Sequence, residues 1–321
     1  MNCYLCEKSN LKIIRTRLRY GIKRNVLQCQ NCGIVYLEPQ KENLVEFYKK
    51  DYRKLYTPVI GEVLNSKESF DIYLPFQQAR LDLIKEILNP EMRALDIGCS
   101  SGHFLYTLKR HVREVIGIEF NEENAKFVNE VLGINVYTSS IENTDIPLEH
   151  FDLITVFQVL EHIDEPINFL EAISKYLKPN GFLYIEVPNI NDALISLYCV
   201  ESYCDFWFIE PHIFYYSLQT LSLLLKKAGF KGSVKTIQSY NFMNHINWIF
   251  VGAPQKSVGI GMSKPVLIPC NSPIGIEDEI KNTLNTFIQK VDGEYKAILE
   301  KYNMGNSIIF IGKKSSNVGR Y

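Results

Sequence analysis

Four cysteines near the start of the chain form two pairs with the spacing Cys-x-x-Cys: Cys3 with Cys6, and Cys29 with Cys32. The two thiolates of such a pair can bind the same metal ion, and four thiolates complete the tetrahedral coordination of zinc. A segment rich in β-forming residues separates the pairs, which is the arrangement of a zinc ribbon. Because four thiolates leave no position for water, we expect a structural rather than a catalytic zinc ion.

A second group of residues has the pattern of a nucleotide-binding turn. An apolar run containing Asp96 leads into a turn with Gly98 and Gly102. Glycine lets the backbone turn sharply and approach a ligand where a side chain would collide. A further apolar run, residues 115–118, ends before Glu119, whose carboxylate can accept hydrogen bonds from both ribose hydroxyls. The pattern predicts a nucleotide-binding crevice at the carboxyl edge of a parallel sheet.

These residues resemble the first motifs of the class I S-adenosylmethionine-dependent methyltransferases. In that family an apolar strand and an acidic residue precede G-x-G-x-G, and serine replaces the middle glycine here. The resemblance implies that S-adenosylmethionine is the cofactor and that the acid after the second strand binds its ribose. The expected cofactor-binding residues are Asp96, Gly98, Ser100, Gly102, Glu119, Phe120 and Phe157.

Three side chains are candidates for the general base: His162, Glu210 and His212. His162 ends a Leu-Glu-His sequence that resembles the strand-end loop of small-molecule methyltransferases, so we expect it beside the transferred methyl group. Residues 203–216 are rich in aromatic side chains and are expected to cover the cofactor, with Glu210 and His212 available for hydrogen bonds and proton transfer. Alternatively, His162 is a structural histidine bound to a loop carbonyl, and the aromatic residues are ordinary core.

Strands and helices alternate along the middle of the chain, which predicts an α/β fold with a doubly wound, Rossmann-like sheet. The resemblance implies seven strands. The expected strands are 93–96, 115–118, 136–137, 151–157, 182–187, 234–237 and 307–312, and the expected helices are 76–88, 121–132, 166–177, 217–228 and 276–302. Residues 248–251 are an alternative for the final strand.

This pattern divides the chain into five parts. We expect a zinc ribbon in residues 1–40, a linker and substrate-side cap in 41–75, a methyltransferase core in 76–243, an insertion or cap in 244–305, and a final strand and tail in 306–321.

The composition is that of an ordinary globular protein, with 46% hydrophobic residues and a formal net charge of −1. The N-terminus has no signal-peptide pattern, and no apolar run approaches the roughly 20 residues of a membrane helix. We therefore expect a cytoplasmic protein without membrane insertion.

Residues 1–33 contain seven Lys or Arg and one Glu. This basic segment could bind nucleic acid, hold the phosphates of a nucleotide-linked substrate, or be an ordinary solvated surface. The chain lacks the Asn/Asp-Pro-Pro-Tyr/Phe motif of enzymes that methylate base amines, so nucleic acid is disfavoured as a partner.

The ribbon, the core and the Glu-Pro-His segment together resemble bacterial sugar-modifying methyltransferases. The resemblance implies a small-molecule substrate, with in-line methyl transfer to a hydroxyl group of a sugar, nucleotide sugar or cell-envelope glycan precursor, assisted by a general base. Two alternatives stay open: a deoxysugar C-methyltransferase and a zinc-ribbon RNA methyltransferase.

Overall fold

The computed structural model describes residues 2–39, 55–56, 59–269 and 278–315. Residues 41–54 and 57–58 of the segment 41–75 that we predicted as a linker and cap therefore lie outside the described residues, as do residues 276–277 of the predicted helix 276–302.

A seven-stranded mixed sheet forms the centre of the molecule, with strand order β10-β11-β8-β7-β4-β5-β6. Strands β4 to β8 are parallel to one another, and β11 runs antiparallel to both β8 and β10. This arrangement confirms the predicted α/β fold with a Rossmann-like sheet. The strands are β4 (Arg93–Ile97), β5 (Glu114–Ile118), β6 (Asn135–Tyr137), β7 (Phe151–Phe157), β8 (Leu177–Pro188), β10 (Phe230–Ile237) and β11 (Ser307–Lys314).

Helices cover both faces of this sheet because alternate strand residues point to opposite sides. On one face, Ile154 and Ile185 belong to a core that includes residues of α7 and α10. On the other face, Leu153 and Tyr184 belong to a core with residues of α4 and α5. The helices around the sheet are α3 (Ser66–Tyr73), α4 (Gln77–Asp82), α5 (His103–Leu108), α6 (Glu122–Glu130), α7 (Pro166–Ser174) and α10 (Leu218–Lys227).

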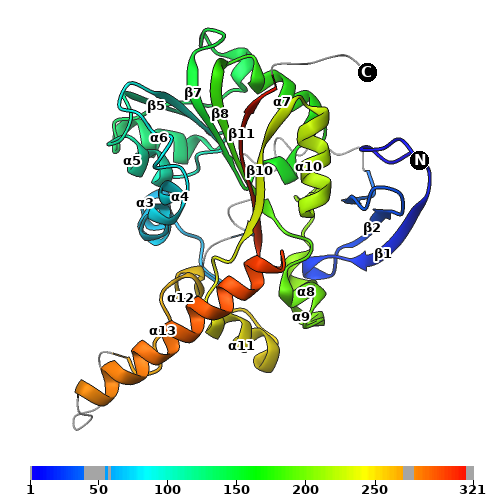
Figure 1. Ribbon diagram of the computed structural model, residues 1–321, viewed down its shortest axis with the longest axis vertical. Helices are drawn as coiled ribbons and strands as arrows, with labels where there is room; N and C mark the ends of the chain where they lie inside the picture. The colour runs from blue at the N-terminus through cyan, green and yellow to red at the C-terminus, as the bar shows by residue number, and fades with distance from the viewer. Residues whose placement is uncertain (1, 40–54, 57–58, 270–277, 316–321) are drawn as a thin grey trace.

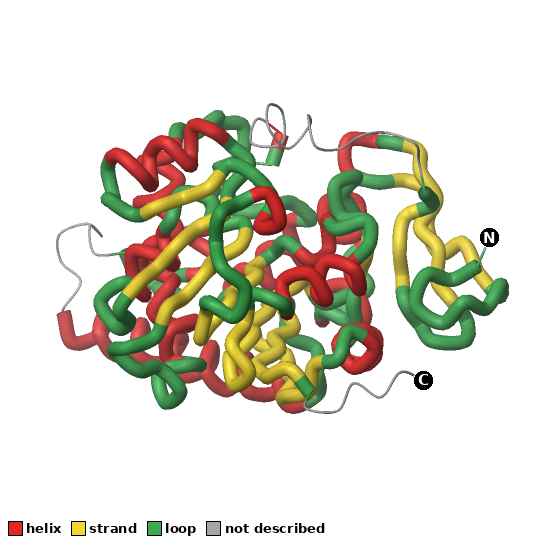
Figure 2. The backbone as a smooth tube through the Cα atoms, turned by 90° about the horizontal axis from the view of Figure 1, so that it is seen from above, coloured by secondary structure: helices red, strands yellow, loops and turns green. Residues whose placement is uncertain are grey.

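A second, four-stranded sheet has the order β1-β2-β3-β9. Three of its strands come from the N-terminal segment, which Figure 2 shows to one side of the main body. The fourth strand, β9, comes from the segment between β8 and β10. The strands are β1 (Leu11–Arg17), β2 (Lys23–Cys29), β3 (Val35–Leu37) and β9 (Phe214–Tyr215), and the short helix η1 (Arg19–Gly21) joins β1 to β2. We call residues 2–37 the four-cysteine module.

The described residues between β10 and β11 include three α-helices, α11, α12 and α13. Helix α11 (Phe242–Val251) includes residues 248–251, so the alternative that these residues form the final strand is wrong. The Asn241 side chain caps this helix by accepting from the Asn244 backbone N–H, and Gly252 ends it with a left-handed backbone. The other elements in and near this region are α8 (Ala193–Ser196), α9 (Glu201–Trp207), α12 (Val258–Met262) and α13 (Asp278–Lys301).

A helix that crosses a bilayer must be both long and apolar. None of the described helices meets both requirements.

Candidate active site

The four cysteines of the N-terminal module are brought together. The Sγ atoms of Cys3 and Cys32 lie 3.6 Å apart, and those of Cys6 and Cys29 lie 3.5 Å apart. Zinc–sulfur bonds of about 2.3 Å in a tetrahedral site would place the sulfur atoms about 3.8 Å apart. The cluster is therefore compatible with a structural zinc ion.

The two cysteine pairs form matching turns. The Glu7 N–H donates to the Cys3 carbonyl, and the Gly33 N–H donates to the Cys29 carbonyl, both at 2.9 Å. Each turn closes on a residue with positive φ, Glu7 at 63° and Gly33 at 82°. Such a backbone is open to glycine and costly for other residues, so Glu7 has a strained conformation that the turn imposes.

This module is tied to the core segment that carries His212. Strand β3 pairs with β9 through Val35 with Tyr215 and Tyr36 with Phe214. The Leu37 N–H also donates to the Ile213 carbonyl at 2.8 Å. The loop that holds His212 is therefore fixed by the sheet of the four-cysteine module.

The predicted nucleotide turn lies between β4 and α5, where glycine is required for two reasons. Gly98 and Gly102 have φ values of 75° and 76°. A Cβ atom on Gly98 would lie 2.3 Å from Val159 Cγ2, and one on Gly102 would lie 2.7 Å from Val128 Cγ2. Ser100 has φ 53°, a left-handed backbone that glycine adopts without strain and serine does not.

Two carboxylates stabilise this turn. Glu119 accepts from the backbone N–H groups of Ser100 and Asn121, both at 2.8 Å. Asp96 is buried and accepts from the Thr155 hydroxyl at 2.6 Å, and burial raises the pKa of Asp96 to about 7. The glycine backbone and the Glu119 carboxylate at the ends of adjacent strands suit a nucleoside ligand.

The two predicted aromatic residues have different positions. Phe120 is 38% exposed beside Glu119. Phe157 is buried, and its ring lies 4.9 Å from that of Phe104 and 4.7 Å from that of Tyr184. Their contact with a cofactor stays a prediction.

The chain makes a strained turn directly after β7. Gln158 has φ 56°, its N–H donates to the Glu186 carbonyl at 2.8 Å, and its side-chain amide donates to Glu186 Oε1 at 3.0 Å. Strained backbone of this kind persists where the surrounding structure imposes it, commonly at functional sites. The turn leads directly into η4 (Leu160–His162).

Two of the three predicted bases, His162 and His212, come together around Glu161. The Nε2 atoms of both histidines lie 3.9 Å from Glu161 Oε1, and the two rings are 4.7 Å apart. Glu161 is 1% exposed, and neither of its carboxylate oxygens has a hydrogen-bond partner among the described residues. A buried carboxylate without a partner is costly, so the arrangement is suited to a ligand that supplies the missing hydrogen bond.

A backbone carbonyl fixes the orientation of His162. The Nδ1 atom of its ring lies 2.9 Å from the Pro211 carbonyl oxygen, which can only accept a hydrogen bond. Nδ1 therefore carries the proton of the neutral ring, and Nε2, which lies 3.9 Å from Glu161 Oε1, is unprotonated.

Burial keeps all three groups uncharged. It raises the pKa of Glu161 to about 8 and lowers the pKa of His162 to about 4. Burial, His162 and the charge of Arg19 lower the pKa of His212 well below its ordinary range. A neutral histidine can accept a proton, whereas a protonated one cannot.

Glu161 was missed as a functional candidate although it precedes His162 in the sequence. The sequence pattern that could have identified it is an acidic residue between an apolar residue and a histidine, just after a buried strand. Glu210, the predicted carboxylate, is not among the residues that line the neighbouring cavity. Its role as a base stays a prediction.

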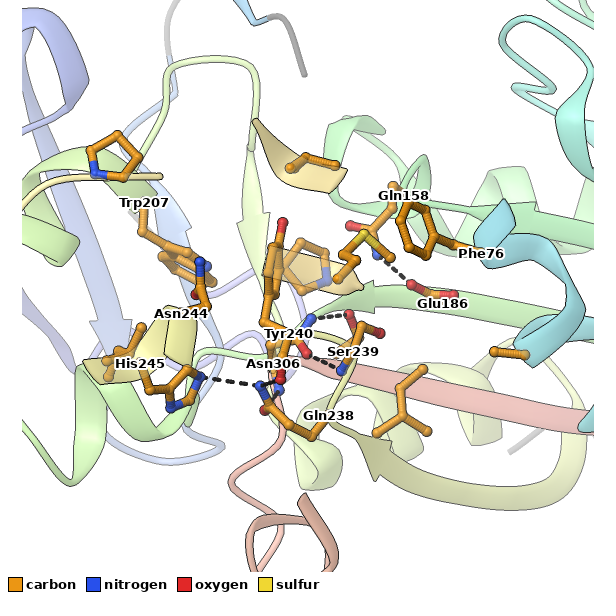
Figure 3. A pocket seen from close by; sticks show the side chains of 18 of the residues that line it. Phe76, Gln158, Glu186, Trp207, Gln238, Ser239, Tyr240, Asn244, His245 and Asn306 are labelled. Atoms are coloured by element: carbon orange, nitrogen blue, oxygen red, sulfur yellow. Dashed lines mark hydrogen bonds between the residues drawn. The ribbon is translucent and has the colours of Figure 1, made fainter. Parts of the chain in front are cut away.

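The cluster opens onto a cavity of about 790 Å³. Figure 3 shows this cavity with side chains from several elements around it, including Gln158 and Glu186 at one end and Asn244 and His245 at the other. Helices α11 and α12 therefore form part of its wall. Aromatic residues and side chains with amide or hydroxyl groups contribute much of the lining: Tyr73, Phe76, Tyr203, Phe206, Trp207, Tyr240, Trp248, Gln158, Gln238, Ser239, Asn244, Gln255 and Asn306.

The spacing of Glu161, His162 and His212 suits an oxygen ligand better than a metal ion. Metal bonds of about 2.1 Å in a tetrahedral site hold ligand atoms about 3.4 Å apart, less than the 3.9 Å observed here. No two of the three ligand atoms are more than 4.8 Å apart. An oxygen atom about 2.8 Å from each can therefore fit between them, which is the length of a hydrogen bond.

Comparison with known proteins identifies the core. A family model described as a methyltransferase domain matches residues 73–233. A ubiquinone biosynthesis O-methyltransferase of Bradyrhizobium diazoefficiens is 33% identical over 105 residues, which cover 31% of this chain and 41% of the relative. The enzyme of the same name from Hydrogenovibrio crunogenus is 22% identical over 196 residues, covering 56% of this chain and 81% of the relative.

A SAM-dependent methyltransferase from Archaeoglobus fulgidus has 21% identity and a TM-score of 0.49, and the match covers 77% of this chain and 97% of that one. The family match spans half of the chain and includes the glycine turn, Glu119 and the cluster residues Glu161, His162 and His212. The chain therefore belongs to the methyltransferase domain family and has the fold of S-adenosylmethionine-dependent methyltransferases.

Proposed function

We propose that this methyltransferase transfers a methyl group from S-adenosylmethionine to a hydroxyl group of a sugar-like acceptor, with Glu161, His162 and His212 as the proton-accepting cluster. The observation that carries this proposal is the buried Glu161 carboxylate, which has no described hydrogen-bond partner and lies 3.9 Å from two histidine nitrogens. An acceptor hydroxyl group placed between these atoms would satisfy all three.

The cofactor would be held by Gly98, Gly102 and Glu119, and it supplies an electrophilic methyl group when bound. The protein must then position the acceptor oxygen and remove its proton. A hydroxyl group is a poor nucleophile at neutral pH, so a base close to it lowers the barrier.

His162 is placed to take this proton. Its Nδ1–H donates to the Pro211 carbonyl, so Nε2 is the unprotonated nitrogen of the neutral ring. The O–H bond would break as the new O–CH₃ bond formed, and the proton would pass to Nε2 of His162. The resulting imidazolium would in turn favour ionisation of the neighbouring Glu161 carboxyl group. Since the three groups share one buried space, the proton belongs to the cluster rather than to one residue.

The cavity lining supports an acceptor with several polar groups. Aromatic rings can pack on the apolar face of a sugar, while amides and hydroxyls form hydrogen bonds at its edge. The named relatives support oxygen as the methylated atom. In this proposal residues 76–243 carry the cofactor and the base, and residues 244–305 form a cap on the acceptor side.

The proposal is tested by incubating the protein with methyl-labelled S-adenosylmethionine and one of four acceptor pools: free sugars, nucleotide sugars, catechols or RNA. We expect methyl ethers on a sugar, identified by mass spectrometry and by the NMR shift of an O-methyl group. Label only in RNA would identify a zinc-ribbon RNA methyltransferase. A carbon-bound methyl group would identify a deoxysugar C-methyltransferase, and label only in catechols would remove the sugar assignment.

A further inference from the structure

Two hydrogen bonds to Glu186 on the neighbouring strand β8 hold the strained turn after β7. The Gln158 N–H donates to the backbone carbonyl of Glu186 at 2.8 Å, and the Gln158 side-chain amide donates to Glu186 Oε1 at 3.0 Å, a bond drawn in Figure 3. A left-handed backbone at a residue other than glycine persists where its neighbours impose it, and Gln158 has φ 56°. Glu186 therefore fixes the turn that leads into η4.

Arg80 of helix α4 holds the other oxygen of the Glu186 carboxylate. Its Nε atom donates to Glu186 Oε2 at 2.8 Å, and its Nη1 atom donates to Gln77 Oε1 at 3.1 Å. The guanidinium carbon also lies 4.4 Å from the centre of the Phe157 ring, a cation–π contact. Phe157 directly precedes Gln158. Arg80 thus contacts both the residue before the turn and the carboxylate that holds the turn.

The ion pair between Arg80 and Glu186 is buried beside the proton-accepting cluster. The two side chains are 19% and 6% exposed, and both residues line the same cavity as Gln158, Glu161 and His162. Removing charges from water is costly, so an apolar pair of similar volume is often at least as stable as a buried ion pair. A guanidinium–carboxylate pair can instead fix one geometry, because the planar guanidinium donates only in defined directions. The contacts of this pair point to that role.

We propose that Arg80 is a positioning residue of this methyltransferase. Through Glu186 it fixes the Gln158 turn, and so it places Glu161 and His162 at the cavity. Its catalytic meaning rests on the proposed function, in which these two side chains belong to the proton-accepting cluster. The order of the turn itself does not depend on the identity of the acceptor.

The test compares three variants with the wild-type protein: Arg80→Met, Arg80→Lys and the double variant Arg80→Met/Glu186→Gln. Methionine keeps an apolar contact with the neighbouring ring but removes the charge and the hydrogen-bond donors. Lys178→Gln is the matched control, because Lys178 Nζ lies 2.7 Å from Asp152 Oδ2 at the opposite ends of the same two strands. Neither residue of this control pair lines the cavity.

Hydrogen exchange of the peptide 158–163, followed by mass spectrometry, reports the order of the turn. The N–H groups of Gln158 and His162 are both hydrogen-bonded there, so loosening of the turn accelerates their exchange. The values of kcat and KM and the calorimetric affinity for S-adenosylmethionine are measured in parallel. Thermal unfolding identifies the variants that fold.

We expect faster exchange of residues 158–163 in Arg80→Met and in the double variant, because the side chain at position 186 loses the donor that orients it. A displacement of about 1 Å at a reacting group costs about 10²-fold in rate, so kcat should fall by this order with a smaller change in KM. Arg80→Lys keeps a charged donor for Glu186, so its exchange and kcat should lie between those of Arg80→Met and the wild-type protein. Lys178→Gln should match the wild-type protein in both.

Wild-type exchange of this peptide in folded Arg80→Met protein would overturn the proposal, and so would an equal acceleration in Lys178→Gln. Faster exchange with an unchanged kcat would show that the turn does not position the cluster. If Arg80→Met fails to fold because Glu186 is left without its partner, the double variant, which leaves no unpaired charge, decides by the same two measurements. Exchange needs no turnover, so faster exchange without methylation of any acceptor pool would support the role of Arg80 in the turn and count against the proposed function alone.

Discussion

Val35 and Tyr215 are paired residues of one antiparallel sheet, although the first belongs to the four-cysteine module and the second to the segment that carries His212. The module is therefore part of the scaffold of the acceptor site. A change at the cysteines should be transmitted through β3 and β9 to the histidine.

Loss of the metal site should reduce catalysis more than cofactor binding. In Cys29→Ser one of the four thiolates is missing, so the turn before β3 loosens and His212 moves from its place beside Glu161. A displacement of about 1 Å at a reacting group costs about 10²-fold in rate, and we expect a loss of this order in kcat. Affinity for S-adenosylmethionine, measured by calorimetry, should change little because the glycine turn lies on other strands.

Cys199→Ser is the control for this experiment, since Cys199 is exposed and outside the cluster. It should behave like the wild-type protein. Metal analysis should find zinc in wild-type protein and less in Cys29→Ser. Full kcat in a metal-free Cys29→Ser protein would show that the module does not support the site.

We expect the Glu161→Gln variant to lose activity but to keep the wild-type fold. Glutamine has a similar volume but cannot ionise, so it cannot exchange a proton with the two histidines of the cluster. General-base catalysis contributes about 10²–10⁴-fold, so kcat should fall by at least about 10²-fold, with a smaller change in KM. The informative comparison is Glu210→Gln: a larger loss there than in Glu161→Gln would move the proton-accepting role to Glu210.

Much of this site could be predicted from local sequence patterns. The Cys-x-x-Cys pairs and the glycine turn are short motifs. Residues next to one another in the sequence set their conformation, so the sequence alone is enough to recognise them. The pairing of Val35 with Tyr215 joins distant segments of two and three residues, too short to give a periodic signal. Residues 248–251 are β-forming by type, yet the cap at Asn241 and the stop at Gly252 make them helical. Glu161 is distinguished only in the structure, where its buried carboxylate has no hydrogen-bond partner among the described residues.

The pH dependence of stability should also change in Glu161→Gln. Burial raises the pKa of Glu161 from 4.5 to about 8, so the folded state binds this proton more tightly than the unfolded state. The associated stability is complete below pH 4.5 and is lost as pH rises through about 8. At about 1.4 kcal/mol per pKa unit, the loss is on the order of 5 kcal/mol.

Glutamine does not titrate, so Glu161→Gln should keep its stability over this range and be more stable than the wild-type protein at pH 9. Urea unfolding at pH 5, 7 and 9 measures the difference. Glu171→Gln, an exposed change on the nearby helix α7, should follow the wild-type curve. Parallel curves for Glu161→Gln and wild type would mean that Glu161 is already ionised in the folded protein.

The nucleotide turn should respond in opposite ways to two small substitutions. In Gly98→Ala the new Cβ atom would meet Val159 Cγ2 at 2.3 Å on a backbone with φ 75°, so the turn must shift away from the position that faces the cofactor. We expect calorimetry to show affinity for S-adenosylmethionine reduced by more than about tenfold, equal to about 1.4 kcal/mol. Ser100→Gly instead relieves a left-handed serine with φ 53° and should bind the cofactor at least as well as the wild-type protein. Equal affinities in Gly98→Ala and the wild-type protein would show that the cofactor does not depend on this turn, whereas a loss confined to Ser100→Gly would assign the binding to the serine hydroxyl.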